Sequence, residues 1–360
     1  MVLSPQAHLA GLAAYELAET GSGPTIHLAS NEAAIRPSRR AIDAAMAALA
    51  DPQLYPDADA TPLRHALAKA HGLEPERIVC TAGSMELILY LALAYLGPGT
   101  ETLTNRYGYL YFDAVARIAG AMPVRARETG MTVDVDALLD AVTPRTRIVF
   151  LANPNNPTGT LLGGDAVRDL EARLPDRVLL VLDAAYGEFV EAADYDDGLR
   201  FARGNPRTVV LHTFSKIHGL AGLRVGWAYG PPAVVDMVNR IRLPNSLTQP
   251  SMAAAMAALA DTDHVRRYRA LNANLRRLVD DRTSAMGLAP VAGHGNFVLL
   301  RFPGGRDQAA TVYRLLKEGG VLLRAMGGYG LGDCLRLTLG VETDLQVALE
   351  RLADAVTTSD

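Results

Sequence analysis

One lysine of this sequence lies among side chains that could hold a phosphorylated aldehyde. Lys216 follows Thr213 and Ser215, and Arg224 comes eight residues after it. A lysine amine can attack an aldehyde and form an imine, while hydroxyl groups and a guanidinium can bind the phosphate. The other two lysines of the chain lie in polar helical patterns and are expected to face solvent. The pattern therefore predicts covalent chemistry at Lys216, and the alternative for a lysine that follows a strand is a plain surface charge.

Two further polar segments follow apolar runs that read as buried strands. Asp183 comes directly after the run 177–182, with Tyr186 three residues later. Such a carboxylate could pair with a protonated ring nitrogen and such a tyrosine with a ring oxygen, or Asp183 could instead be a helix N-cap. The segment 153–159 offers asparagine amides in a turn fixed by proline and glycine, or it is an ordinary loop. In an open parallel sheet these strand ends would converge on one crevice.

A fourth segment could contribute to a phosphate site. Ser84 and Met85 begin a predicted helix directly after Gly83 and the strand-like run 77–81. Free backbone amides and the positive end of the helix dipole favour an anion at such a position. The alternative is that Gly83 is only a turn residue.

The order of these patterns predicts an α/β fold in which a mostly parallel sheet is flanked by helices. Continuous apolar runs alternate with helical periodicity through the first two-thirds of the chain, which is typical of a layered α/β domain. The remainder has an α+β pattern. We expect an N-terminal arm over 1–29 that joins the small domain, a large domain over 30–243 and a small domain over 244–360.

The composition is that of an ordinary globular enzyme. The chain has 360 residues, 49% of them hydrophobic and 21% charged, and its net charge of -4 gives no reason to expect nucleic acid as a partner. Two cysteines in a chain of this length indicate buried free thiols. Neither a secretory leader nor an apolar run of membrane-spanning length is evident, so we expect a cytoplasmic protein without membrane or metal.

Taken together and in order, these motifs resemble the fold-type I pyridoxal-phosphate aminotransferases, most closely the histidinol-phosphate aminotransferase group. The segments that carry the resemblance are Ser30-Asn31-Glu32, Tyr55-Pro56, Asn155-Asn156-Pro157-Thr158-Gly159, Thr213-Phe214-Ser215-Lys216, Leu220-Ala221-Gly222-Leu223-Arg224-Val225-Gly226, Gly327-Gly328-Tyr329-Gly330-Leu331 and Leu335-Arg336-Leu337-Thr338. The resemblance implies an aspartate-aminotransferase-like fold, pyridoxal 5'-phosphate as cofactor, and a homodimer with shared active sites. It also implies transfer of an amino group between a donor, such as a histidinol-phosphate-like amine, and a 2-oxo acid such as 2-oxoglutarate.

The resemblance further implies a role for individual residues. Lys216 would hold the aldehyde as an imine and act as general acid-base, and Asp183 would keep the ring nitrogen protonated. The remaining cofactor contacts would come from Tyr186 and Asn156 at the ring oxygen, from Tyr109, rather than Tyr107, at the ring face, and from Thr213, Ser215, Arg224, Ser84, Met85 and the partner's Tyr55 at the phosphate. The substrate contacts would come from Arg336 at the carboxylate, Arg324 at a substrate phosphate, Asn31 and Tyr15.

Two questions stay open at the level of sequence. Where the group usually has asparagine, proline and glycine after Asn31-Glu32, this chain has Ala33, Ala34 and Ile35, so the amino donor is undetermined. The same scaffold also supports decarboxylases, lyases and cyclases, because substrate orientation decides which bond breaks. A cofactor-binding sensor of a transcription regulator is a third reading, but no basic DNA-reading segment precedes the first strand motifs.

Overall fold

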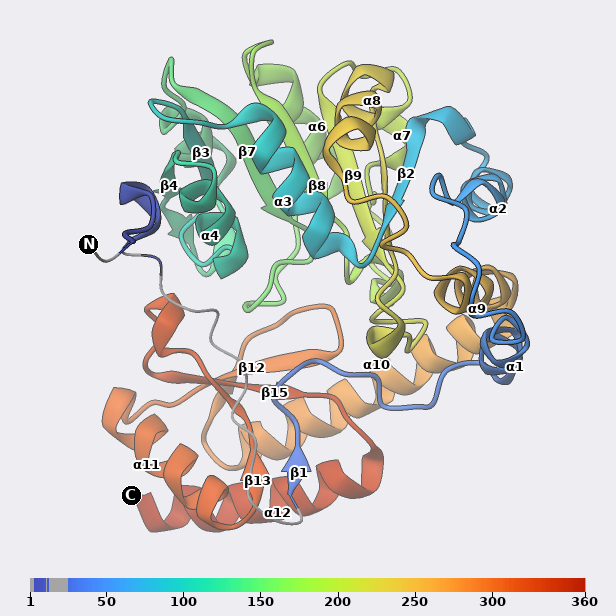
Figure 1. Cartoon of the computed structure of the whole chain (residues 1–360). Coiled ribbons are helices and arrows are strands. Elements are labelled where there is room, and N and C mark those ends of the chain that lie inside the picture. Colours follow the sequence, from blue (N-terminus) through green and yellow to red (C-terminus); the bar gives the residue numbers. More distant parts are fainter. Residues whose placement is uncertain (1–2, 11, 13–24, 360) are drawn as a thin grey trace.

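The computed structural model describes residues 3–10, 12 and 25–359, and these form two lobes (Figure 1). The upper lobe is built on a seven-stranded sheet with the order β2-β10-β9-β8-β7-β3-β4. All neighbouring strands are parallel except β10, which is antiparallel to both β2 and β9. The strands are β2 (Ile78–Thr81), β3 (Glu101–Asn105), β4 (Met122–Ala126), β7 (Thr146–Ala152), β8 (Leu179–Asp183), β9 (Thr208–Thr213) and β10 (Gly226–Tyr229).

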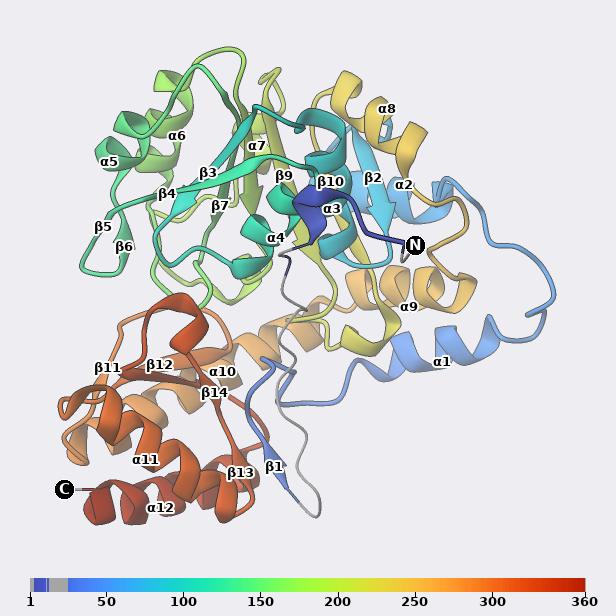
Figure 2. The ribbon, with the colours of Figure 1, turned by 60° about the vertical axis from the view of Figure 1, so that its left-hand side comes forward.

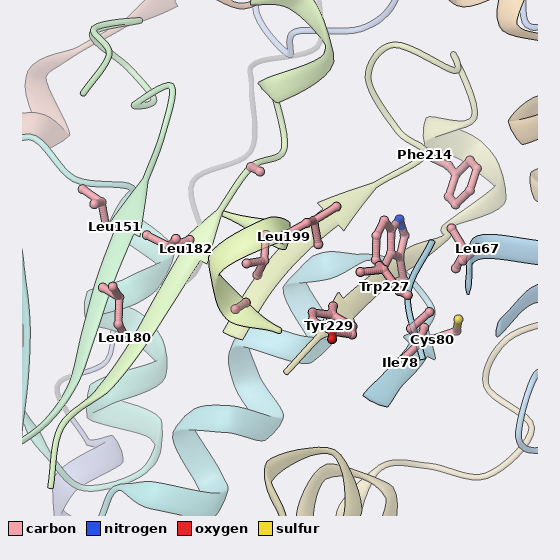
Figure 3. Close-up of a cluster of buried hydrophobic side chains, with 14 of the residues drawn as sticks. Leu67, Ile78, Cys80, Leu151, Leu180, Leu182, Leu199, Phe214, Trp227 and Tyr229 are labelled. Atoms are coloured by element: carbon pink, nitrogen blue, oxygen red, sulfur yellow. The ribbon is translucent and has the colours of Figure 1, made fainter. Parts of the chain in front are cut away.

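Helices cover both faces of this sheet because its strands are apolar on both sides. Along β7, Ile148 and Phe150 belong to one buried layer, and Val149 and Leu151 belong to the other. The first layer packs on α3 (Ser84–Tyr95), α4 (Leu110–Ile118) and α8 (Pro232–Ile241). The second packs on α1 (Arg39–Ala47), α2 (Thr61–His71), α5 (Val135–Asp140), α6 (Gly164–Arg173), α7 (Leu199–Ala202) and α9 (Gln249–Ala260). Figure 3 shows part of this second layer, where Trp227, Leu67 and Ile78 come together.

The lower lobe is smaller and is built on an antiparallel sheet with the order β11-β12-β15-β14 (Figure 2). Its strands are β11 (Ala289–Pro290), β12 (Phe297–Arg301), β14 (Arg324–Ala325) and β15 (Cys334–Thr338), and its helices are α10 (Thr262–Ala285), α11 (Gly305–Glu318) and α12 (Glu342–Ser359). The short strand β1 (Ile26–His27) pairs in parallel with β13 (Val321–Leu322), which ties the segment that begins at residue 25 to this lobe. A hairpin of β5 (Glu128–Thr129) and β6 (Thr132–Val133) extends from the upper lobe.

The packing of α9 differs from the domain division expected from the sequence. Met252, Ala255 and Ala258 of this helix lie in the core of the large sheet, although residues from 244 onward were expected in the small domain. Tyr268 and Leu275 of the next helix, α10, lie in the core of the small lobe. We therefore propose that the boundary between the domains lies at the junction of α9 and α10.

The fold class expected from the sequence is confirmed: a large, mostly parallel sheet flanked by helices is joined to a smaller α+β unit. Cys80 and Cys334 are both free and buried. Burial raises the pKa of both thiols to about 12. No helix within the described ranges is long and apolar enough to cross a membrane.

The start of β10 lies unusually close to the start of α3. A Cβ atom on Gly226 would lie 2.2 Å from the backbone nitrogen of Ser84, and a Cβ on Gly83 would lie 2.2 Å from Nη2 of Arg224. The atoms that a Cβ on Gly226 would meet belong to the backbone, so only hydrogen fits at that position, whereas the atom opposite Gly83 is the movable end of the Arg224 side chain. Gly226 therefore lets β10 bring the Arg224 segment against the first turn of α3.

We expect Gly226→Ala to destabilise the protein, because its new methyl group can be accommodated only if β10 and α3 separate. Overpacking of this kind costs about 1–3 kcal/mol, which would lower the midpoint of urea unfolding. Gly222→Ala is the matched control: no atom lies within 4 Å of its added Cβ, so its effect should stay within about 0.5 kcal/mol. Equal midpoints for the two variants would contradict this account of the packing.

Candidate active site

A cavity of about 590 Å³ lies where the carboxyl ends of β7, β8 and β9 face the small sheet. The large sheet contributes the loops after these strands and the first turn of α3, and the small lobe contributes β14 and β15. The residues predicted from the sequence that line this cavity are Asn31, Ser84, Met85, Tyr109, Asn156, Asp183, Tyr186, Thr213, Ser215, Lys216, Arg224, Arg324 and Arg336. The three polar segments that follow apolar strands therefore meet at one place, as expected.

Lys216 points its amine into this cavity from the loop after β9. The Nζ atom donates a hydrogen bond of 3.0 Å to the backbone oxygen of Asn31 and lies 5.6 Å from the centre of the Tyr186 ring. Asn31 itself has a left-handed backbone with φ of 54°. The Lys216 amine is thus held between the two lobes, beside a tyrosine ring.

Asp183 is the last residue of β8, and its carboxylate is buried with only 7% of the residue exposed. Its Oδ1 accepts a hydrogen bond of 3.0 Å from the backbone N–H of Ala185. Burial raises the pKa of Asp183 to about 6, although the charges of His212 and Lys216 act in the opposite direction. No α-helix begins here: a turn leads to the 3-10 helix Gly187–Phe189, whose N-cap is Tyr186. The alternative reading of Asp183 as a helix N-cap is therefore wrong.

A network of side-chain hydrogen bonds joins the Tyr186 hydroxyl to the small lobe. Asn31 Nδ2 donates to the Tyr186 hydroxyl over 2.9 Å, and Thr338 Oγ1 lies 3.3 Å from Asn31 Oδ1. Asn296 Nδ2 donates to the backbone oxygen of Asn31 over 3.1 Å. The sequence assigned no role to Thr338, which was named only within the segment 335–338, or to Asn296, because each acts through a partner that is hundreds of residues away.

Arg336 is buried in β15 and is only partly paired. Its Nη1 donates to Asn156 Oδ1 over 2.6 Å and its Nη2 donates to the Ala29 backbone oxygen over 2.9 Å. Its buried Nε has no hydrogen-bond partner among the described residues. Burial lowers the pKa of this guanidinium from its usual value. A buried cation with a spare donor is what an anionic group entering the cavity would bind.

Hydroxyls, amides and a guanidinium together form an anion cradle at the first turn of α3. Ser84 and Met85 follow Gly83, whose φ is 94°, and Arg224 has a left-handed backbone with φ of 52°. Arg224 Nη1 donates to Ser215 Oγ over 3.3 Å. Ser84, Met85, Ser215 and Arg224 all line the cavity, and helix N-terminal amides together with a guanidinium favour a phosphate or another oxyanion.

Three of the predicted aromatic residues differ in their placement. Tyr109 lines the cavity, and its ring packs edge-on against Phe112 with centroids 5.6 Å apart. Tyr55 is 88% exposed and lines a separate cavity of about 450 Å³, away from the rest of the site. Tyr15 lies outside the described residues. Tyr329, which the sequence named only within the segment 327–331 and without a role, also lines the main cavity.

Among residues 3–10, 12 and 25–359, no group of three or more histidine, cysteine, aspartate or glutamate side chains could hold a metal ion.

The known proteins described below, to which this chain is similar, are aminotransferases. Residues 24–352 match the family model for aminotransferase class I and II. A histidinol-phosphate aminotransferase of Rhodospirillum centenum is 46% identical over 329 residues, which is 91% of each protein. One of Rhodospirillum rubrum is 45% identical over 91% of this chain and 89% of its own length. A crystal structure of histidinol-phosphate aminotransferase from Sinorhizobium meliloti, in complex with pyridoxal-5'-phosphate, has a TM-score of 0.89 at 28% identity and covers 92% of this chain and 90% of that one.

The raised pKa of Asp183 predicts how Asp183→Asn changes the stability of the ligand-free protein with pH. The pKa is 3.8 for an ordinary aspartate and about 6 in the fold, so the stability from its protonation is present below pH 3.8 and lost as the pH rises through 6. We therefore expect Asp183→Asn to be increasingly more stable than the wild type between pH 4 and pH 6.5, by at most about 3 kcal/mol.

Urea unfolding at a series of pH values measures this difference, with Asp165→Asn as the control because the Asp165 side chain is 99% exposed. A stability gain for Asp183→Asn that does not grow with pH would show that burial does not disfavour this carboxylate.

Proposed function

The chain belongs to the family of class I and II aminotransferases, and we propose that it uses pyridoxal 5'-phosphate to move an amino group from a phosphorylated amine to a 2-oxo acid. The observation that carries the proposal is the meeting of Lys216, Asp183 and the anion cradle in one cavity. The donor set fits the cofactor: a buried carboxylate suits a protonated ring nitrogen, and the cradle at α3 suits a phosphate. The spare Nε of buried Arg336 suits a substrate carboxylate.

Each group of residues would contribute one part of the cofactor site. The cofactor supplies an aldehyde that bonds to amines and a ring that withdraws electrons from the substrate carbon. Lys216 Nζ would bond to that aldehyde and, once released, hold and move the proton at the substrate carbon. Asp183 would keep the ring nitrogen charged. The remaining contacts would be those of Tyr186 and Asn156 with the ring oxygen, Tyr109 with the ring face, and Ser84, Met85, Thr213, Ser215 and Arg224 with the phosphate.

The small lobe would bind the substrate through two arginines on neighbouring strands. Arg324 of β14 and Arg336 of β15 are directly opposite each other in the antiparallel register, and both line the cavity. Two neighbouring guanidinium groups suit one substrate with two anionic groups. They also suit two substrates that bind in turn and each place one anionic group here. We assign Arg336 to the carboxylate of the acceptor and Arg324 to a donor phosphate, with Asn31 and Tyr15 as further substrate contacts.

A homodimer would complete the cofactor site. Tyr55 is 88% exposed, and near it in sequence Met46, Leu49 and Leu54 are 66%, 56% and 67% exposed. Exposed apolar side chains gathered in this way are typical of a surface that is covered by a partner. We propose that a second copy of the chain covers this surface and that the Tyr55 hydroxyl of each copy reaches the phosphate in the other.

Steady-state kinetics with a panel of donors and 2-oxoglutarate tests the substrate assignment. We expect turnover with histidinol phosphate, and we expect Arg324→Gln to raise KM for this donor by roughly 10- to 100-fold, the loss of one charged hydrogen bond. KM for an aromatic amino acid, which has no phosphate, should change little in the same variant. Arg301→Gln is the matched control, since Arg301 lies on the same small sheet but pairs with Asp333.

Two results would contradict the proposal. An equal rise in KM for both kinds of donor would show that Arg324 does not bind the donor phosphate. Products of elimination or decarboxylation without any amino transfer would favour a lyase or decarboxylase on this scaffold.

A further inference from the structure

Thr338 is a buried polar residue of the small sheet that bonds to Asn31 but has no proposed contact with cofactor or substrate. It is the last residue of β15, is 2% exposed and does not line the cavity. Arg336, two residues earlier, lies on the same face of the strand, because successive side chains alternate between the faces of a sheet. Thr338 Oγ1 accepts a hydrogen bond of 3.0 Å from the backbone N–H of Asn31.

The Thr338 hydroxyl fixes the orientation of the Asn31 amide. A hydroxyl carries one hydrogen, and because Oγ1 accepts from the Asn31 N–H, that hydrogen remains for Asn31 Oδ1, which lies 3.3 Å away. The opposite orientation of the amide would place Nδ2, a donor, against the hydroxyl, whose hydrogen would then have no acceptor among the described residues. Oδ1 therefore faces Thr338, and Nδ2 faces Tyr186.

The Asn31 amide in turn determines the role of the Tyr186 hydroxyl. Asn31 Nδ2 donates to this hydroxyl over 2.9 Å, so the phenol oxygen accepts and its single hydrogen remains to be donated. No group among the described residues accepts that hydrogen. Asn31 and Tyr186 both line the cavity, so we expect the acceptor to be a molecule that enters it.

A second residue of β15 orients a second donor in the same manner. Arg336 Nη1 donates to Asn156 Oδ1 over 2.6 Å, which leaves Nδ2 as the donor end of that amide. Asn156 also lines the cavity. One strand of the small lobe therefore orients two donors of the large lobe, the Asn156 amide and the Tyr186 hydroxyl.

We propose that Thr338 is a positioning residue that acts through the Asn31 amide to hold the Tyr186 hydroxyl as a hydrogen-bond donor toward the cavity. That the acceptor is the ring oxygen of pyridoxal 5'-phosphate rests on the proposed function, whereas the coupling of the three side chains does not. Hydrogen bonds in such a chain strengthen one another. Each hydroxyl should therefore affect the other, although the hydrogen bonds of the described residues do not join Thr338 directly to Tyr186.

Asn296 holds the Asn31 backbone independently of Thr338. The Asn296 side chain is fully buried, and its Nδ2 donates to the backbone oxygens of Asn31 and Glu32 over 3.1 and 2.9 Å. These bonds support the left-handed backbone of Asn31, whose φ is 54°. Thr338→Val, which replaces the hydroxyl with a methyl group, should therefore free the Asn31 amide without releasing the chain.

A pH titration of the absorbance of the bound cofactor tests the direction of the Tyr186 hydrogen. The colour changes when the proton shared by the ring oxygen and the Lys216 nitrogen is lost, and a donor at that oxygen stabilises the negative charge left there, which lowers the midpoint. In Thr338→Val we expect the midpoint to rise by roughly 0.5 to 1 pH unit, the effect of weakening one hydrogen bond. Thr338→Ser is the matched control, because it keeps the hydroxyl and should stay within about 0.2 unit of the wild type.

Asn31→Gly tests the route of the effect, because it removes the amide while glycine tolerates the left-handed backbone. We expect this variant to raise the midpoint as Thr338→Val does, and Thr338→Val added to it should cause no further shift. Three results would overturn the positioning role: an unchanged midpoint in Thr338→Val, equal shifts in Thr338→Val and Thr338→Ser, or a further shift in the double variant.

A double-mutant cycle of Thr338→Val and Tyr186→Phe, measured by urea unfolding of the cofactor-free protein, tests the coupling without the proposed function. Thr338→Val also leaves the Asn31 N–H unpaired, so the informative quantity is the deviation from additivity. We expect the double variant to lose less stability than the sum of the single variants, because both break the same chain of bonds. Tyr268→Phe is the control: its hydroxyl accepts from the N–H of Ala34 in the same segment over 2.8 Å, and its loss should add to that of Thr338→Val.

Additive losses in the Tyr186 cycle, or equal deviations in both cycles, would overturn the coupling. A wild type that fails to bind pyridoxal 5'-phosphate would contradict the proposed function and the ring oxygen as acceptor. In that case the cycle still decides whether Thr338 orients Tyr186.

Discussion

The buried carboxylate of Asp183 is the constraint around which the rest of this site is arranged. An ionised group at the end of β8 is costly unless opposite charges and hydrogen-bond donors surround it. The fold supplies the N–H of Ala185 directly, and it supplies the charges of Lys216 and His212 from β9 and the loop that follows it. An incoming cationic ring nitrogen would complete this compensation. The same feature that makes the ligand-free protein less stable thus makes it selective for a protonated ring.

Contacts between the lobes hold the remaining groups in place. Arg336 of the small lobe donates to Asn156 of the large one, and Lys216 donates to the backbone oxygen of Asn31. At the backbone level, the N–H of His294 donates to the oxygen of Gly159 over 2.7 Å. The cofactor residues of the large sheet and the substrate arginines of the small sheet are therefore coupled through the loop that carries Asn156.

The sequence predicted the parts of this arrangement that depend on local patterns. A polar residue directly after an apolar strand is a local signal, and it located both Asp183 and the Lys216 segment. The contacts of Asn296 and Thr338 with Asn31 join distant segments, so no local sequence pattern predicts them. The sequence also could not predict which lobe α9 packs against, because the alanines of this helix form no apolar stripe that favours one lobe.

The proposed site depends on Lys216 as the amine that would bond to the cofactor. Borohydride reduction after addition of pyridoxal 5'-phosphate, followed by peptide mass spectrometry, tests it most directly, because the chain has only two other lysines. Both of these, Lys69 and Lys317, are exposed. We expect one stable adduct on Lys216 and none in Lys216→Ala. An adduct on Lys69 or Lys317 in its place would contradict it.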